Sequence, residues 1–141
     1  MAGRWSVPWR AVDVLSSRIL LRPSVFEDAV RWYRDVLGLH VYREYGVAGR
    51  VTGVVFFLGG GFLELVGDSS SVSGGGGALW LQVANVDAEH ERLRAQGVDV
   101  QRPPKTEPWG LRECWIADPD GVQIRLIEVP DDHPLRRRLG D

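Results

Sequence analysis

Polar or aromatic side chains alternate with aliphatic ones in several strand-like runs of this 141-residue chain. Glu64 and Trp80 each have leucine on both sides, and Arg125 lies between Ile124 and Leu126. Because successive side chains of a strand point to opposite faces, the pattern predicts that Glu64, Trp80 and Arg125 lie opposite the aliphatic core. A carboxylate, a guanidinium and an indole on such a face can bind charge and stack on a flat molecule.

Arg18 is predicted to join this face from an earlier strand, so two guanidiniums accompany the carboxylate of Glu64. The residues leave two interpretations open. Either Glu64 is neutralised in a structural ion-pair cluster, because buried charges require partners. Or one arginine is left over and donates hydrogen bonds to a carbonyl, phenolate or carboxylate of a ligand.

The aromatic residues favour a stacking site, since the chain has six tryptophans. Trp80 is the first candidate for a flat wall in a cleft, although its ring would also serve to plug it. Trp115 is a second candidate, and Trp109 in a proline-rich loop is predicted to act as a lid. Four further residues are expected to line the same cleft, namely Phe62, Gln82, Phe56 and Tyr42.

Residues of nucleophilic or metal-binding type are scattered. Cys114 is the single cysteine, which excludes a disulfide within the chain, and it has no histidine nearby in the sequence. His40, His90 and His133 are far apart and follow no metal-ligand spacing. The sequence therefore shows no nucleophile–base pair and indicates a binding site rather than a reactive one.

Charge and hydropathy exclude other classes of partner. A net charge of −2 and a pI of about 5.9 give no strong electrostatic attraction to nucleic acid. The longest apolar runs, such as 54–58, are too short to cross a bilayer, and the N-terminal residues lack the apolar run of a targeting signal. We expect a soluble, cytoplasmic protein without a membrane or nucleic-acid partner.

The same order of elements occurs twice along the chain. In the first half, strands at 17–22, 39–45, 51–58 and 62–66 accompany a helix that begins at Ser24, with a capping box to Glu27, and stops at Gly38. In the second half, strands at 78–84, 98–101, 112–117 and 122–129 accompany a helix that Asp87 caps and Gly97 ends. A proline-rich loop at 103–108 precedes the third strand of that half.

The repeat predicts an α+β fold of two βαβββ modules, whose curved mixed sheets surround a cleft. The boundaries place module 1 at about 15–67, a glycine- and serine-rich linker at 68–77, module 2 at about 78–129 and a tail at 130–141. The whole chain, 1–141, is predicted to form a single domain.

Four motifs in order and spacing resemble the glyoxalase/bleomycin-resistance, or vicinal oxygen chelate, superfamily over residues 15–129. These are the helix end RWYRDVLGL at 31–39, FLEL at 62–65, the second helix from VDA at 86–88 to Gly97, and DPDG at 118–121 followed by IRLIE at 124–128. The resemblance implies the fold of paired βαβββ modules. Family members commonly dimerise, so it also implies a homodimer, with a cleft formed within one chain or across two.

Enzymes of this superfamily hold a metal ion with residues at four strand positions. In this chain those positions fall on Arg18, Glu64, Ala78 and Arg125. Guanidiniums and a methyl group are not metal ligands, so the resemblance is closest to the metal-free, drug-sequestering branch. No cofactor and no metal are therefore expected, and the catalytic set is empty.

The leading hypothesis is metal-independent binding and sequestration of a small aromatic natural product or antibiotic, of the self-resistance type. The ligand-binding set is predicted to comprise Trp80, Arg18, Glu64, Arg125, Trp115, Trp109, Phe62, Gln82, Phe56 and Tyr42. An alternative is a metal-independent isomerase or cyclase with Glu64 as general base, for which adjacent arginines make the carboxylate a poor base. A metal-dependent enzyme with displaced ligands is a further alternative.

Overall fold

The computed structural model of the protein describes residues 14–67 and 77–136. Its first sheet has the order β1-β4-β3-β2, built from β1 (Arg18–Leu21), β2 (Val41–Val47), β3 (Arg50–Leu58) and β4 (Gly61–Val66). The second has the order β5-β8-β7-β6, built from β5 (Ala78–Gln82), β6 (Asp99–Thr106), β7 (Arg112–Ala117) and β8 (Gln123–Glu128).

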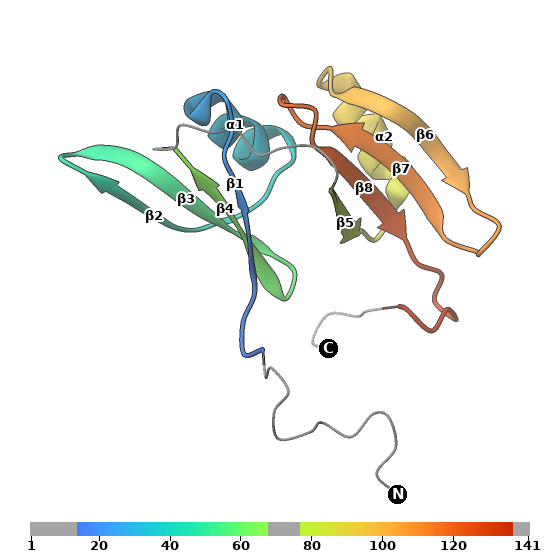
Figure 1. Ribbon diagram of the computed structural model, residues 1–141. Coiled ribbons are helices and arrows are strands. Elements are labelled where there is room, and N and C mark those ends of the chain that lie inside the picture. Colours follow the sequence, from blue (N-terminus) through green and yellow to red (C-terminus); the bar gives the residue numbers. More distant parts are fainter. Residues whose placement is uncertain (1–13, 68–76, 137–141) are drawn as a thin grey trace, which may run out of the picture.

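The two sheets have the same pairing pattern. β1 runs parallel to β4 and β5 runs parallel to β8, whereas the remaining neighbours are antiparallel. Figure 1 shows the two modules side by side, each with its helical segment. The predicted α+β fold of two βαβββ modules is confirmed. The predicted linker, apart from Gly77, and residues 137–141 of the predicted tail lie outside the described residues.

Each module carries one helical segment between its first two strands. In module 1, α1 (Phe26–Arg31) continues directly into the π-helical turn η1 (Trp32–Val36), and in module 2 the helix is α2 (Val86–Ala95). The predicted stops are confirmed, because Gly38 and Gly97 follow these helices with φ angles of +88° and +78°. A left-handed backbone of this kind is easiest for glycine.

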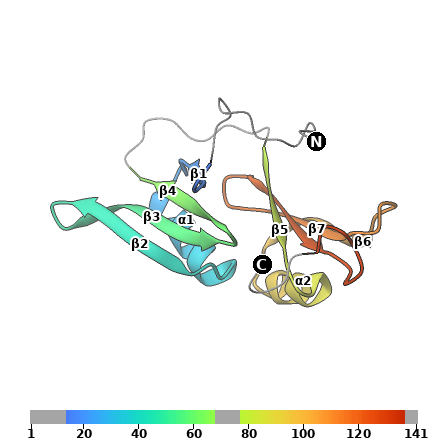
Figure 2. The same cartoon turned by 90° about the horizontal axis from the view of Figure 1, so that it is seen from below.

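One hydrophobic core is common to both modules. It contains Tyr33 of η1, Phe56 of β3, Leu93 of α2 and Ile124 of β8, all fully buried. Figures 1 and 2 both show the modules lying next to each other, which agrees with this shared core. Burial of the aliphatic face of each sheet under the helices leaves the opposite faces of both sheets without helical cover.

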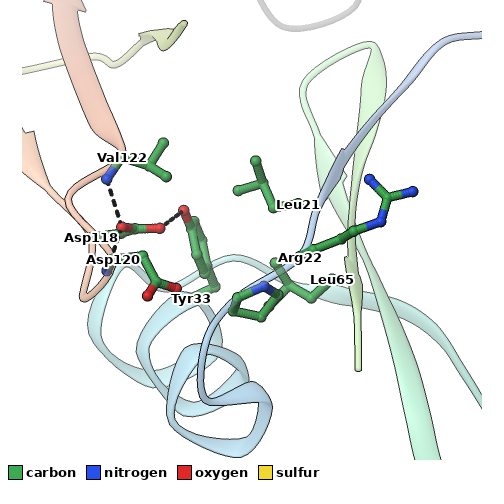
Figure 3. A pocket seen from close by; sticks show the side chains of 8 residues that line it. Leu21, Arg22, Tyr33, Leu65, Asp118, Asp120 and Val122 are labelled. Atoms are coloured by element: carbon green, nitrogen blue, oxygen red, sulfur yellow. Dashed lines mark hydrogen bonds between the residues drawn. The ribbon is translucent and has the colours of Figure 1, made fainter. Parts of the chain in front are cut away.

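Polar contacts also join the modules. Arg92 of α2 donates to the carbonyl oxygens of Val36 and Leu37 at 2.9 and 3.2 Å, at the end of η1. The Tyr33 hydroxyl reaches Asp118 in the turn between β7 and β8, beside a small pocket between the modules (Figure 3). The modules are therefore held together through their helical side.

The predicted helix caps are wrong at both helices. The residue before α1 is Val25, without a side-chain cap, because Ser24 donates from both its hydroxyl and its backbone N–H to Asp120 of the other module. At α2 the cap is Asn85, whose side chain accepts from the backbone N–H of Ala88. The predicted cap of that helix, Asp87, instead pairs with Arg112.

The predicted strand at 98–101 is too short. β6 continues through Pro103 and Pro104, which the sequence pattern assigned to a loop. β6 lies at the edge of its sheet, and its pairing with β7 shifts register on both sides of Arg102. Proline lacks a backbone N–H, so it is tolerated at a sheet edge and at such irregularities.

Candidate ligand-binding faces

The open face of the first sheet carries a cluster of exposed aromatic rings. Tyr42 and Phe57 are 49% and 46% exposed, and Phe62 lies beside both with ring centroids 4.9 and 5.8 Å away. The core side of the same strands is aliphatic, with Leu63 and Leu65 fully buried. The aromatic cluster Tyr42–Phe57–Phe62 is thus an apolar surface at the outside of the module, formed by rings that are tilted against one another.

Glu64 lies on the same open face and has both carboxylate oxygens occupied. Arg18 donates to Oε1 at 2.6 Å, and the Tyr45 hydroxyl donates to Oε2 at 2.5 Å. The Tyr45 hydrogen bond lowers the pKa of Glu64 below its ordinary value, with a further contribution from Arg18, whereas burial acts in the opposite direction. Glu64 is therefore an ionised, fully engaged acceptor.

Tyr45 reaches Glu64 by lying across a glycine on the neighbouring strand. Gly53 is its register partner on β3, and a Cβ atom there would lie 1.9 Å from Tyr45 Cζ. Only a residue without a side chain leaves room for this ring. Gly53 is thus a structural requirement of the Arg18–Glu64–Tyr45 contact.

The open face of the second sheet carries an alternating row of tryptophan and arginine. Trp80, Arg125, Trp115 and Arg102 are successive register partners across β5, β8, β7 and β6. The guanidinium carbons of Arg102 and Arg125 lie 3.8 and 4.2 Å from the centroid of the Trp115 ring. Cations above an aromatic ring are attracted by its electron-rich face. We call these four residues the Trp–Arg row.

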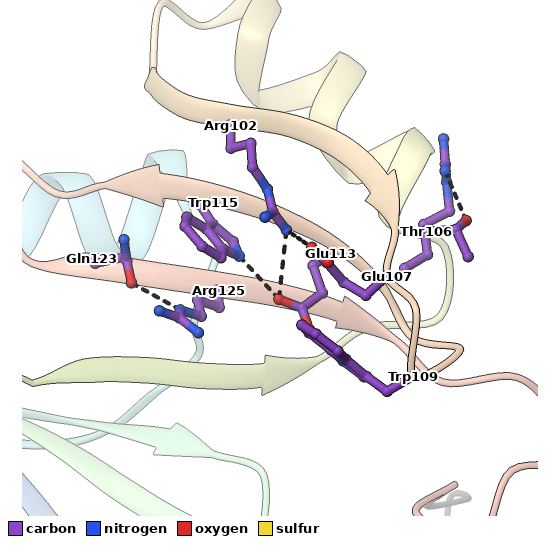
Figure 4. A network of polar contacts seen from close by, with 9 residues as sticks. Arg102, Thr106, Glu107, Trp109, Glu113, Trp115, Gln123 and Arg125 are labelled. Carbon is purple, nitrogen blue, oxygen red and sulfur yellow. Dashed lines mark hydrogen bonds and ion pairs between the residues drawn. The ribbon is translucent and has the colours of Figure 1, made fainter.

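A buried carboxylate fixes one end of the Trp–Arg row (Figure 4). Glu113 accepts from the indole N–H of Trp115 at 3.0 Å and from that of Trp109 at 3.2 Å, and it lies 3.7 Å from Arg102. Arg102 also pairs with Glu107, and both glutamates are almost completely buried. Trp109, although 59% exposed, is therefore tied to the sheet by its indole N–H.

The structure brings some predicted site residues together and separates others. Arg18, Glu64 and Phe62 lie together on the first sheet. Trp80, Arg125 and Trp115 lie together on the second, and within the described residues no hydrogen bond or ion pair joins them to Glu64. Gln82 and Ala78 are on β5, on the same face as Trp80. The predicted single cluster around Ala78 is therefore divided between the open faces of two sheets.

Phe56 is the clearest misplacement among the predicted lining residues. It is fully buried in the core beneath the helices, and its neighbour Phe57 takes the exposed position beside Tyr42. Trp115 is on the open face as predicted, with Cys114 and Ile116 in the core. Its ring, however, has an arginine at contact distance on each side, so it stacks on protein groups instead of presenting a free surface.

Sequence reasoning missed several residues that build these faces, namely Tyr45, Phe57, Arg102, Glu107 and Glu113. Arg102 and Glu107 were hidden because the prolines between them were taken for a loop. Phe57 was missed because residues 54–58 are all apolar, so alternation does not show which of the adjacent Phe56 and Phe57 is exposed. The glycine at position 53 was the available signal for a ring lying across β3, because glycine within a strand often marks a close approach.

The residues at the family's metal positions do not fit a metal ion. Arg18 and Arg125 are cationic, Ala78 has no donor atom, and both oxygens of Glu64 are bonded to other side chains. Within residues 14–67 and 77–136, no group of three or more His, Cys, Asp or Glu side chains is arranged to hold a metal. The donor chemistry of these faces is thus that of hydrogen bonding and ring stacking.

Comparison with known families agrees with this architecture. The profile of the Glyoxalase/Bleomycin resistance protein/Dioxygenase superfamily matches residues 16–126. The chain therefore belongs to this superfamily, which confirms the resemblance seen in the sequence. Comparison with curated protein sequences gives no match.

Several solved structures are similar. TioX from Micromonospora sp. ML1 is 25% identical with a TM-score of 0.67, covering 80% of this chain and 97% of its own. A superfamily member from Sphaerobacter thermophilus DSM 20745 is 25% identical with a TM-score of 0.62, covering 84% and 98%. UcmS2, at 20% identity, has a TM-score of 0.69 and covers 82% and 98%, which shows a common fold.

Proposed function

We propose that this protein binds a small aromatic natural product or antibiotic without a metal ion and sequesters it unchanged, as a self-resistance protein does. One observation carries the proposal. At the four positions where superfamily enzymes hold their metal, this chain has two arginines, an alanine and a glutamate whose oxygens are both occupied. The positions that would support metal chemistry are thus used for charge pairing and ring contacts.

The exposed rings support an aromatic ligand. Trp80 is 48% exposed on the second sheet, and the cluster Tyr42–Phe57–Phe62 is exposed on the first. Stacking of aromatic pairs contributes about 0.5–1.5 kcal/mol beyond the burial of area. Micromolar affinity needs about 8 kcal/mol, so burial of the ligand's apolar area has to add to stacking and to a charge-assisted hydrogen bond.

The geometry of Glu64 argues against the enzymatic alternative. A general base works best with a pKa close to the working pH. Arg18 and Tyr45 occupy the two oxygens and lower the pKa of Glu64, so it is a weak proton acceptor. Binding without chemical change is the function that these contacts favour.

The proposal includes a homodimer in the cytoplasm. Each chain leaves aromatic side chains exposed on the open faces of both sheets, and a second copy that covers them would enclose the ligand between sheets. Superfamily membership adds to this expectation by analogy. Within the described residues, no helix is long and apolar enough to cross a membrane. Sedimentation analysis of the full chain tests the dimer.

The function is tested by equilibrium dialysis of the metal-stripped full chain against an anthracycline, a tetracycline and a phenazine, followed by mass spectrometry of the recovered ligand. We expect saturable binding of at least one compound, its recovery unchanged, and the same affinity with added Mn²⁺, Ni²⁺ or Zn²⁺. The Trp80→Ala variant should bind more weakly.

A matched control is Trp32→Phe, because Trp32 lies in the helical segment of module 1 and packs on the core. It should bind as the unchanged protein does. Conversion of the ligand to a product, or binding that appears only after metal is added, contradicts sequestration and supports an enzyme. Equal loss of affinity in Trp80→Ala and Trp32→Phe would show that the ligand does not bind specifically at Trp80.

A further inference from the structure

The arginines beside aromatic rings differ in how their charge is balanced, and Arg43 beside Tyr45 is exposed to solvent. Arg18 has the carboxylate of Glu64, and Arg102 has those of Glu107 and Glu113. Arg125 contacts no carboxylate within the described part of the chain. Its hydrogen-bond partner there is the neutral amide of Gln123, which accepts from Nε at 2.8 Å. A partly buried guanidinium without an anionic partner is unusual, because removing an unpaired charge from water is costly.

The orientation of Arg125 is nevertheless fixed. One face of the guanidinium lies against the Trp115 ring at 4.2 Å, and the Gln123 side chain holds Nε. Trp115 is held in turn by its hydrogen bond to Glu113 and by Arg102 on its other face. The terminal Nη groups of Arg125 thus remain available as oriented donors, the geometry that suits bidentate binding of a carboxylate.

The nearby carboxylates do not form an ion pair with Arg125. Glu107 and Glu113 bind Arg102, which lies on the opposite side of the Trp115 ring from Arg125 (Figure 4). Glu113 also accepts from two indole N–H groups, which spread its charge. Its oxygens are therefore engaged within the network, and the anion for Arg125 has to come from outside it.

Trp80 lies next to Arg125 on the side away from Trp115. It is the register partner of Arg125 on β5, on the same open face, and it is half exposed. Neighbouring strands are about 4.8 Å apart, so a ring stacked on Trp80 has its edge within reach of the Arg125 donors. An anionic oxygen on that ring, or on a carboxylate attached to it, would meet the guanidinium.

From this arrangement we propose that the ligand is an aromatic acid, in which an anionic oxygen on the ring system binds Arg125 while the ring stacks on Trp80. This inference rests on the proposed aromatic-binding function and narrows it to carboxylates and phenolates. Trp115, Arg102 and Glu113 are positioning residues that hold the guanidinium, and Trp115 is not itself a ligand wall.

The test uses two probes of the same shape, 2-naphthoate and 2-naphthamide, in calorimetric titrations of the full chain at pH 7. The carboxylate is ionised and the amide is neutral, so their difference reports the anion contact. Both probes can accept from the guanidinium, but only the carboxylate adds attraction between opposite charges and a bidentate contact, so naphthoate should bind about tenfold more tightly than naphthamide.

The variant Arg125→Gln should abolish this preference by weakening naphthoate more than naphthamide, whereas Arg125→Lys should retain part of it. Trp80→Ala should weaken both probes equally. The matched control is Arg34→Gln, which removes an exposed arginine that pairs with Asp35 on the helical side. It should keep the full preference, and thermal melts verify that each variant is folded.

The outcomes separate this inference from the proposed function. Equal affinity for the two probes, or a preference that survives Arg125→Gln, overturns the assignment of Arg125 and leaves an aromatic site intact. If Arg34→Gln loses the preference for naphthoate to the same extent, the preference arises from long-range electrostatics, and the assignment of Arg125 is again overturned. If neither probe binds at millimolar concentration, the inference and the proposed aromatic site both fail.

Discussion

The hydroxyl of Tyr33 donates a 2.7 Å hydrogen bond to Asp118 Oδ2, across 85 positions of the sequence and between the two modules. Asp118 also accepts from the backbone N–H groups of Asp120 and Val122, so its carboxylate shapes the turn of the DPDG motif while it binds the helix (Figure 3). Burial raises the pKa of Tyr33 above its ordinary value, and Asp118 adds to this effect. The phenol therefore remains a hydrogen-bond donor.

We expect Tyr33→Phe to lower the free energy of unfolding by about 1–3 kcal/mol, because it leaves a buried carboxylate without one of its donors. Urea denaturation followed by circular dichroism measures the change. Tyr42→Phe is the control, since Tyr42 lies on an open face and is half exposed. A loss in Tyr33→Phe no larger than in the control would show that this bond does not hold the modules together.

Arg92 is expected to stabilise the module interface more than its neighbour Arg94. Arg92 donates to two carbonyl oxygens at the end of η1, whereas the Arg94 side chain, among the described residues, bonds to Glu91 on its own helix. Arg92→Leu should cost about 1–2 kcal/mol through the unsatisfied carbonyl groups. Arg94→Leu should cost clearly less, because an exposed pair on one helix contributes little. Thermal unfolding of the two variants makes the comparison, and equal costs would contradict it.

Local rules of periodicity account for most of what the sequence predicted correctly. Aliphatic alternation located the strands, and Gly38 and Gly97 marked the helix ends, because both signals depend only on neighbouring residues. The helix caps failed for the opposite reason. Ser24 has the right type and spacing for a capping box, but Asp120 of the other module offers it a stronger, charged acceptor. A contact between residues 96 positions apart leaves no local pattern.

In the candidate site too, the features set by neighbouring residues were predicted correctly and those set by distant contacts were not. Alternation placed Glu64, Trp80 and Arg125 on open faces, but it contains no information on which sheets face each other, so a single cluster was predicted where the structure has two. Arg102 was missed because its strand continues past the predicted end at 101, through prolines that the sequence pattern assigned to a loop, and its pairing with β7 is irregular there. Phe56 was misplaced because residues 54–58 are all apolar, so the sequence does not show which of the two adjacent phenylalanines points to the core.

The charge of Glu64 should make the stability of the protein depend on acidity. Tyr45 and Arg18 lower the pKa of Glu64 in the folded protein. The ionised Glu64 therefore stabilises the folded protein fully above the ordinary carboxyl pKa, and this contribution disappears as the pH falls through the lower pKa of the folded state. The difference in free energy of unfolding between the unchanged protein and Glu64→Gln should be constant from pH 7 to 6. It should shrink below about pH 4.3, the ordinary value for glutamate.

Urea denaturation at several pH values measures this difference, and Glu27→Gln serves as a control for removing an exposed carboxylate from the same module. Comparing each variant with the unchanged protein cancels the other carboxylates that titrate in the same range, including Asp87 and Glu91. A Glu64→Gln difference that grows as the pH falls has the wrong sign and would contradict the contacts of Glu64.

The stacking of Arg125 on Trp115 should appear as a coupling free energy in a double-mutant cycle. Trp115→Leu, Arg125→Met and the double variant are compared by urea denaturation, and the expected coupling is about 0.5–2 kcal/mol, the range for a partly desolvated cation over an indole. A parallel cycle pairs Trp115→Leu with Arg112→Met, because Arg112 lies on the same strand as Trp115 but bonds to Asp87. Its coupling should be clearly smaller than that of the first cycle. Equal couplings in the two cycles would mean that Trp115 acts through general packing of β7, and the Arg125 guanidinium would then lose the support that makes it an oriented donor.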